Sequence, residues 1–187
     1  MPIALLALLA LAQTDAPAPK PPRLPFFGLN AGTYLPTSAA VRNRFGDNWF
    51  SFSPGLGTVL PPLVPSPMAD LSLATRSKTV DTFNNRVFMA LLGQQYQWPL
   101  FKLTPVEGQA LRLPLVLPYM GVSAGAVYAN LRSEADTVNN NGFAATGSVY
   151  VGASIGLNGF LQARWRTMGR IHGFDLSGLD LVAGVRF

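Results

Sequence analysis

The sequence predicts an all-β fold, an eight-stranded antiparallel transmembrane β-barrel with a short helix in the first outer loop. Three observations lead to this prediction. The 187 residues are 49% hydrophobic and only 12% charged, whereas soluble domains carry about 25% charged residues. Beyond the N-terminal segment, no apolar run approaches the roughly 20 residues that a membrane-spanning helix needs. About eight segments of about ten residues alternate between apolar and more polar positions, as the strands of a barrel wall do.

The N-terminal 25 residues precede the predicted barrel. Ile3 to Leu11 form a short apolar run, and the following small residues resemble a cleavage site, so residues 1–12 are predicted to be a signal peptide. The basic residues that usually come before such a run are missing, since the first positive residue is Lys20. Residues 13–25 are rich in Pro and Ala and predict an extended periplasmic linker. The alternative for the first segment is a short buried helix.

The first strand and the helix follow the linker. Phe26–Leu35 is predicted as a strand because glycines and an asparagine alternate with larger, mostly apolar residues. In the loop after it, Thr37 or Ser38 can cap a short helix. Gly46 stands where such a helix would end.

Three further strands complete the first half of the predicted barrel. Asn48–Val59 has phenylalanines two residues apart and is followed by a proline-rich turn. In Met68–Ser77, Asp70 shares one face with a serine and an arginine, and leucines lie on the other face. Asn85–Trp98 is also predicted as a strand, although its middle fits a helix as well. Residues 99–114 show no pattern that assigns them to an element.

The second half of the chain alternates throughout. Its four predicted strands are Leu117–Arg132, Phe143–Leu157, Phe160–Met168 and Phe174–Phe187. Residues 133–142 are predicted as a polar loop, and Asn158-Gly159 is the strongest hairpin dipeptide in the chain. Eight strands form the smallest common barrel, whose interior is filled by side chains.

The last two strands show the clearest division of faces. Arg164 and Arg166 alternate with apolar residues, and Asp180 and Arg186 lie opposite the apolar positions of the final strand. If "MGRIHG" closes their hairpin, Asp180 faces Arg164 across the pair. Charges inside so narrow a barrel need partners. We therefore predict a lumen charge network of Asp180, Arg164, Arg166 and Arg186 that plugs the barrel.

Aromatic residues are predicted to form two girdles, as bilayer interfaces select. One rim would carry Phe26, Phe27, Trp98, Tyr119, Phe160 and Phe187. The other rim would carry Trp49, Phe50, Phe143 and Phe174. The alternative is that these are ordinary core aromatics.

Residues 26–187 resemble the OmpA/OmpW-type family of small bacterial outer-membrane β-barrels. The resemblance rests on the strand number, on glycine-rich strands such as "YMGVSAGAVYANL", and on the ending "LDLVAGVRF". In that family, such an ending is read by the outer-membrane assembly machinery, which implies this role for Phe187, Val185 and Leu181. The resemblance also implies a Gram-negative-type bacterium and the cell outer membrane. The implied role is structural, adhesive or the binding of small apolar ligands.

No catalytic chemistry is predicted. The chain has no cysteine and one histidine. His172 lies in a predicted loop without an adjacent serine, and Ser177 is five residues further on. The spacing of a metal site or a nucleotide-binding loop is not found, so no metal and no other cofactor is expected.

The charge pattern bears on the partners. The 14 Lys and Arg residues are scattered, which argues against nucleic-acid binding. Five of them fall in predicted outer loops, where they would suit the phosphates of lipopolysaccharide or simply be solvated: Arg42, Arg44, Lys78, Arg132 and Arg170. Outer-membrane lipids, lipopolysaccharide and the assembly machinery are thus the expected partners. The oligomeric state is not predicted.

Two alternatives remain from the sequence alone. One is a secreted, soluble lipocalin-like barrel that carries a ligand, and the other is a lipid A-modifying barrel enzyme. The outward face discriminates the first from a membrane barrel, because a soluble barrel needs a polar exterior.

Overall fold

The structure is a computed structural model, and it describes residues 27–56, 66–80, 82–100, 116–134, 138–156 and 158–187. The predicted signal peptide and the linker, residues 1–12 and 13–25, lie outside the described residues, as do Phe26 and residues 101–115. Within the described part of the chain, no helix is long and apolar enough to cross a membrane.

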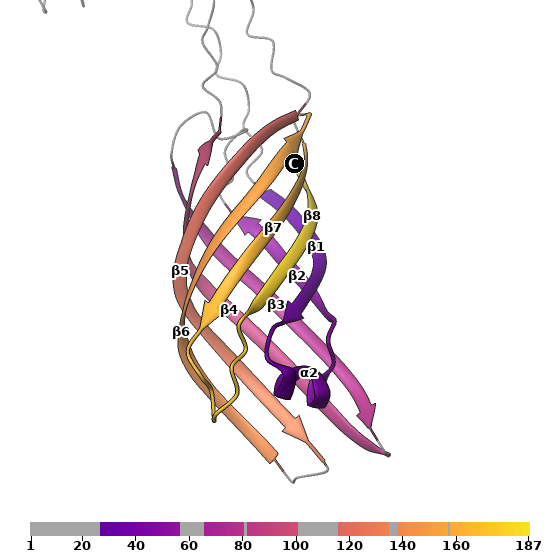
Figure 1. Ribbon diagram of the computed structural model, residues 1–187. Coiled ribbons are helices and arrows are strands. Elements are labelled where there is room, and N and C mark those ends of the chain that lie inside the picture. Colours follow the sequence, from indigo (N-terminus) through magenta and orange to yellow (C-terminus); the bar gives the residue numbers. More distant parts are fainter. Residues whose placement is uncertain (1–26, 57–65, 81, 101–115, 135–137, 157) are drawn as a thin grey trace, which may run out of the picture.

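Eight antiparallel strands close into a barrel in chain order (Figure 1). The strands are β1 (Phe27–Pro36), β2 (Trp49–Leu56), β3 (Ser66–Val80), β4 (Phe83–Pro99), β5 (Val116–Ser133), β6 (Val138–Ile155), β7 (Gly159–Met168) and β8 (Gly178–Arg186). Each strand pairs with its sequence neighbours, and β8 pairs with β1 to close the wall. The prediction of an eight-stranded antiparallel barrel is confirmed.

The four central strands are longer than the sequence predicted. Strands β3 to β6 have 15 to 18 residues, against 8 to 10 in the others. Strand β6 begins at Val138, inside the segment predicted as a polar loop, because Asn139 continues the ladder opposite Arg132. The polar residues of this segment show no strand-like alternation, so its pairing with β5 was not predicted from the sequence. The hairpins β3–β4 and β5–β6 therefore project past the rest of the barrel at the end opposite the C-terminus (Figure 1).

The predicted helix is present as α2 (Ala39–Phe45), at the same end as the projecting hairpins (Figure 1). It begins after Ser38, whose side chain makes no capping hydrogen bond, and ends at Gly46. Gly46 has a φ of 92°, which favours glycine, and its N–H donates to the carbonyl of Arg42 at 2.8 Å. Val41 and Phe45 are fully buried, so the helix covers one end of the barrel.

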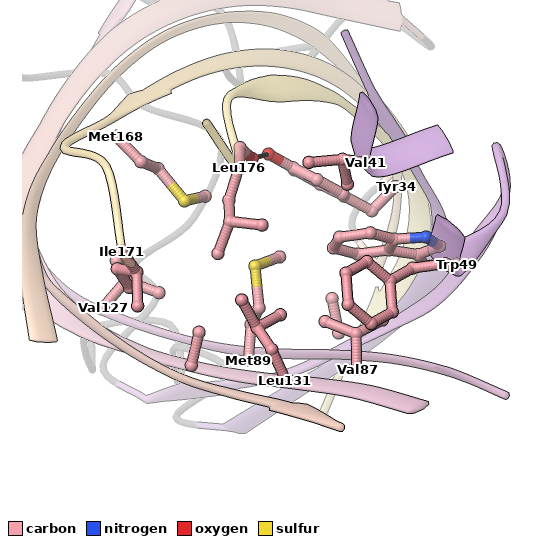
Figure 2. Close-up of a cluster of buried hydrophobic side chains, with 13 residues drawn as sticks. Tyr34, Val41, Trp49, Val87, Met89, Val127, Leu131, Met168, Ile171 and Leu176 are labelled. Carbon is pink, nitrogen blue, oxygen red and sulfur yellow. Dashed lines mark hydrogen bonds between the residues drawn. The ribbon is translucent and has the colours of Figure 1, made fainter. Parts of the chain in front are cut away.

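An apolar core fills the barrel beneath α2 (Figure 2). Its buried members are Tyr34, Val41, Phe45, Trp49, Ala74, Val87, Met89, Val127, Ala129, Leu131, Met168, Ile171 and Leu176. The sequence analysis predicted a lumen filled by side chains and assigned a charge network to it, but it did not predict this apolar part. The reason is that α2 and the segment between β7 and β8 cover this end, so the side chains below them are shielded from water and pack as in a soluble core.

The segment between β7 and β8 corrects the predicted start of the last strand. Strand β8 begins at Gly178, whereas the sequence placed its start at Phe174. Ile171 and Leu176 instead point into the apolar core, and the hydroxyl of Tyr34 donates to the Leu176 carbonyl. Phe174 contacts Phe45 of α2 edge-on, with 5.7 Å between ring centroids. Burial of these side chains outweighs continuation of the ladder.

The outer wall of the barrel is apolar. Large hydrophobic side chains point outward from the strands, with Phe143 77% and Leu92 67% exposed. Others on this face are Phe50, Tyr96, Met120, Val149, Val151, Leu161, Trp165 and Leu181. An exterior of this kind is the opposite of what water-facing strands show.

The aromatic girdles are only partly as predicted. Phe50, Phe143 and Phe187 are exposed, whereas Trp49 and Tyr119 are buried in the interior. The prediction also fails for Phe160, which lines a pocket inside the barrel, and for Phe174 in the β7–β8 loop. Position near a rim does not decide the face, because successive strand residues point to opposite sides. The side chains of Phe26 and Phe27 lie outside the description.

Candidate functional site in the barrel interior

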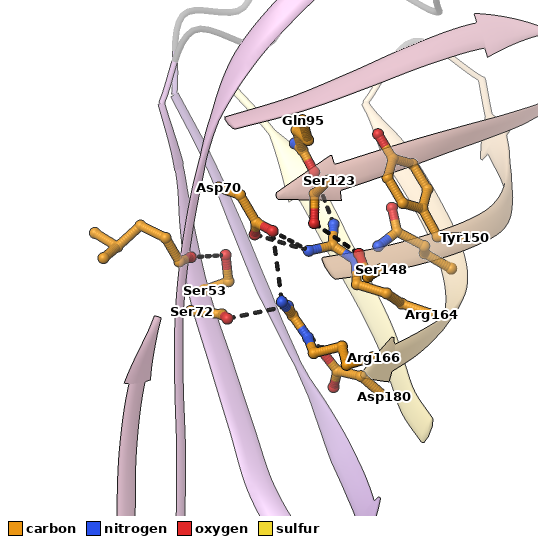
Figure 3. Close-up of polar contacts among 12 residues, drawn as sticks. Ser53, Asp70, Ser72, Gln95, Ser123, Ser148, Tyr150, Arg164, Arg166 and Asp180 are labelled. Atoms are coloured by element: carbon orange, nitrogen blue, oxygen red, sulfur yellow. Dashed lines mark hydrogen bonds and ion pairs between the residues drawn. The ribbon is translucent and has the colours of Figure 1, made fainter. Parts of the chain in front are cut away.

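Four charged side chains meet inside the barrel (Figure 3). They lie on the side of the apolar core away from α2, since Ala74 and Met168 of that core follow them along β3 and β7. Strand alternation turns Asp70 of β3, Arg164 and Arg166 of β7, and Asp180 of β8 inward, and all four are 3–5% exposed. The register pairs Arg164 with Asp180 across the β7–β8 hairpin, the pairing expected from its turn. This charge network has two carboxylates and two guanidinium groups, so its formal charges balance.

The shortest ion pair among the described residues crosses the barrel. Nη1 of Arg164 lies 2.7 Å from both carboxylate oxygens of Asp70. Strands β7 and β3 are four strands apart in either direction around the closed wall, so the arginine reaches the opposite side. The sequence had predicted Asp180 as the acid facing Arg164. The backbones do face each other, but the guanidinium turns to Asp70, because a long side chain in a narrow barrel reaches past its neighbour.

Arg166 joins the two acids. Its Nη1 lies 3.4 Å from Asp70 Oδ2, and its Nη2 lies 3.4 Å from Asp180 Oδ2. Nη2 also donates to the hydroxyl of Ser72 at 3.0 Å. Of the predicted arginines whose side chains are described, Arg166 is the one that forms an ion pair with Asp180. The second oxygen of Asp180 is buried without a hydrogen-bond partner among the described residues.

Polar neighbours fix the Arg164 guanidinium from two sides. Nη2 donates to Gln95 Oε1 at 2.7 Å, and the Tyr150 ring lies 4.7 Å from the guanidinium carbon, a cation–π distance. The Tyr150 hydroxyl donates to the carbonyl of Tyr96 at 3.0 Å. Ser123 and Ser148 share a hydrogen bond of 2.6 Å beside this group (Figure 3). A side chain held at this many points has one orientation.

Tyr150 of β6 and Tyr119 of β5 each lie over a glycine of the neighbouring strand. A Cβ built on Gly121 would stand 2.2 Å from the Tyr150 ring, and one on Gly152 would stand 2.4 Å from the Tyr119 ring. Glycine is therefore required at both positions for the rings to lie flat against the wall. This close approach accounts for two of the glycines of β5 and β6, Gly121 and Gly152.

Little space is left around the charge network. Two interior cavities border it, with volumes of ≈ 10 Å³ and ≈ 40 Å³. One water molecule needs about 10–15 Å³ on this measure. These cavities have room for isolated waters, not for an open column of water.

Several predicted site residues lie elsewhere. The side chain of Arg186 lies outside the description, so its place in the network stays a prediction. Leu181, Val185 and Phe187 are exposed on the outer side, and their role in assembly also stays a prediction. His172 has a φ of 49° and its Nε2 lies 2.8 Å from the Asn141 carbonyl. Ser177 accepts from the Met168 N–H at 3.0 Å.

Asp70 is the interior residue that the sequence analysis left out of the network. The sequence pattern separates its face from that of the neighbouring leucines, but the predicted network was restricted to the last two strands. The available signal was the strand number, since an eight-stranded barrel is narrow enough for arginines to reach the far wall.

The chemistry of this interior is that of a structural charge cluster. Its acids are engaged by guanidinium groups, and the described residues contain no group of three His, Cys, Asp or Glu side chains that could hold a metal ion. The arrangement fastens β3, β7 and β8 to one another through the lumen.

Fold and interior together define a small, closed β-barrel with an apolar wall and a charged, filled lumen. No protein-family model matches the chain, and no curated protein sequence does. Among solved structures, it is similar to the crystal structure of Neisserial surface protein A (NspA), with a TM-score of 0.54 and 14% sequence identity. The match covers 86% of this chain and 94% of that one. At this identity, the likeness shows the shared fold.

Proposed function

We propose that the protein is an outer-membrane β-barrel of the OmpA/OmpW type with a plugged lumen, and that its role is structural. The observation that carries the proposal is the inversion of polarity. Buried Asp and Arg side chains lie inside, while large apolar side chains such as Phe143 and Leu92 are exposed outside. Such a wall suits lipid, where strands must be closed so that every backbone group is paired.

The filled interior favours a barrel that blocks the flow of ions, as opposed to one that forms a channel. The apolar core and α2 close one end, and the charge network lies in the lumen next to this core. Each layer alone would oppose ion flow, the first because it excludes charge and the second because its side chains leave only small cavities.

The filled interior also argues against the two alternatives. A lipocalin-like carrier needs a ligand cavity of several hundred cubic ångströms, whereas the interior cavities here measure ≈ 10 Å³ and ≈ 40 Å³. A lipid A-modifying enzyme needs a nucleophile beside a base. His172 and Ser177 instead bond to backbone groups of β6 and β7.

The proposed location also includes an orientation of the barrel in the membrane. The solved neighbour is a surface protein by its title, which supports placing the long hairpins β3–β4 and β5–β6 at the cell surface. The chain ends of the barrel, at the opposite rim in Figure 1, would then face the periplasm.

Two measurements test the proposal. After expression in a Gram-negative host, the protein should fractionate with the outer membrane and migrate differently in gels before and after boiling. Reconstituted into planar bilayers, the wild type should give no steady channel currents. Recovery in the soluble fraction would contradict the membrane location, and regular single-channel openings would contradict the plug.

A variant of the charge network makes the conductance test sharper. Arg164→Ser and Arg166→Ser together remove both guanidinium groups that fill the lumen, and we expect occasional currents from this protein. The matched control is Arg42→Ser with Arg170→Ser, which removes the same charge from exposed sites and should stay silent.

A further inference from the structure

We propose that the outer wall of β3, β4 and β5 binds the phosphate group of a membrane lipid between Arg86 and Arg132. This inference rests on the proposed membrane location, since only there does the outer wall face lipid. It adds a specific partner and a specific site to that function.

The two arginines form an unusual pair. Arg86 on β4 and Arg132 on β5 are direct register partners, and both side chains are exposed on the outer face. Like charges directly opposite each other destabilise a sheet. Among the described residues, neither arginine has an ion-pair partner. Glu134, the residue that follows the end of β5, accepts a hydrogen bond from the Asn84 N–H at 2.8 Å. An external anion would relieve the repulsion.

The pair borders a groove that is suited to a phosphate. The groove has a volume of ≈ 410 Å³, and its lining includes Ser77, Phe88 and Asn130 besides the two arginines. Guanidinium groups bind phosphate oxygens through two parallel N–H bonds. The Ser77 hydroxyl and the Asn130 amide add neutral donors, and Phe88 supplies an apolar side.

The surroundings select a lipid over a free anion. Along the outer face, successive rows of register partners become more polar towards the arginine pair. The first row is apolar and aromatic, the second is mixed, and the third is polar and charged. These rows are Leu73, Ala90, Tyr128 and Phe143, then Thr75, Phe88 and Asn130, then Ser77, Arg86 and Arg132. Each row is two residues, about 7 Å, further along the strands. An acyl chain lying against the aromatic row would therefore place its phosphate beside the arginines. Aromatic side chains are typical of the boundary between the acyl chains and the headgroups.

Lipid binding to the detergent-solubilised full chain tests the proposal. The probe is lipid A, a glycolipid with phosphate monoesters, and bound molecules are counted by native mass spectrometry. Phosphatidylcholine serves as the zwitterionic reference, and glycerol phosphate as the soluble competitor. The variants are R86Q/R132Q and R86K/R132K. The comparison variant R42Q/R170Q removes the same charge from α2 and the β7–β8 loop, which were also expected to suit lipopolysaccharide phosphates, so it separates binding in the groove from binding at these outer loops.

We expect R86Q/R132Q to weaken lipid A binding by about tenfold, as the loss of charged hydrogen bonds predicts. R86K/R132K should lie between this variant and the wild type, because lysine keeps the charge but not the paired donors. R42Q/R170Q should bind lipid A as tightly as the wild type does, and the affinity for phosphatidylcholine should be the same in all variants. Glycerol phosphate at the same concentration as lipid A should not displace the bound lipid A.

Other outcomes would overturn the site. Unchanged lipid A binding in R86Q/R132Q, or an equal loss in R42Q/R170Q, would show that the arginine pair is not the site. Displacement by equimolar glycerol phosphate would assign the groove to a soluble anion. Heat-modifiable gel mobility checks that each variant folds. A wild type that fails to enter membranes contradicts the proposed function itself, whereas normal insertion with unaltered lipid binding contradicts only this inference.

Discussion

Arg164 of β7 and Asp70 of β3 form an ion pair between strands on opposite sides of the barrel, with 2.7 Å from Nη1 to each carboxylate oxygen. Ladder hydrogen bonds connect only neighbouring strands. This ion pair connects walls that the ladder does not, and it is nearly excluded from solvent. Its loss should therefore affect the whole barrel.

Replacing Asp70 by alanine should lower the free energy of unfolding by about 3–5 kcal/mol, because two buried guanidinium groups lose a partner. Reversible urea unfolding in lipid vesicles measures this. Asp47→Ala is the control, since Asp47 is exposed and its removal should change stability by less than about 0.5 kcal/mol. Equal effects of the two changes would contradict a structural role for the charge network.

A double-mutant cycle should distinguish the two acids. The coupling energy between Asp70 and Arg164 should exceed about 1.5 kcal/mol, within the range for contacting charged residues. The cycle between Asp180 and Arg164 should give a smaller value, since Asp180 contacts Arg166. The reverse order would mean that the sequence-based pairing of Arg164 with Asp180 describes the energetics better than the observed contacts.

Alternation in the sequence was sufficient to predict much of this fold. It determined the strand number and the inward faces of Arg164 and Asp180, and it separated Asp70 from the leucines of its strand, because strand side chains alternate strictly between faces. The helix was found because Ser38 and Gly46 are typical of helix ends. These are local signals, and the hairpin register of β7 and β8 is local too.

The features that sequence reasoning missed depend on contacts between distant parts of the chain. Arg164 selects Asp70 over Asp180 because the barrel is closed and narrow, which no single strand reveals. Trp49 and Leu176 are buried because α2 and the β7–β8 loop cover one end. The extension of β6 to Val138 depends on its pairing with β5. In each case the contact partner or the element boundary depends on residues that are distant in the sequence, so the local pattern does not determine it.

The outward face of β8 can be tested with Leu181→Arg. Leu181 is 38% exposed on the outer wall, and a charge facing lipid there should cost about 2–4 kcal/mol if it lies near the bilayer midplane. Leu181→Met keeps the side chain apolar and is the control. Unfolding in vesicles measures both, and an arginine variant as stable as the methionine variant would show that this face does not meet lipid.

The apolar core beneath α2 can be tested at Trp49. Its ring is fully buried, lies 5.5 Å from that of Tyr34, and its Nε1 donates to the Gly46 carbonyl at 2.8 Å. Trp49→Ala should lower the free energy of unfolding by about 3–5 kcal/mol, the usual cost of deleting a buried aromatic ring. Trp165→Ala removes an exposed tryptophan of the outer wall and should cost clearly less. Equal losses would mean that the core does not stabilise this end of the barrel.

The loop between β7 and β8 should respond to acid through Asp175. Its carboxylate accepts hydrogen bonds from Ser177, including the backbone N–H at 2.9 Å, and these bonds, helped by Arg170, hold the pKa of Asp175 below its usual value. A lowered folded-state pKa contributes stability above the unfolded pKa of about 3.9, and this stability is lost as the pH falls through the folded value.

The wild type should therefore be more stable than Asp175→Asn at pH 6, and the difference should shrink towards pH 3. Urea unfolding of both proteins across this range measures the difference. A difference between wild type and Asp175→Asn that stays constant from pH 6 to pH 3 would show that the charged form of Asp175 does not hold this loop against the apolar core.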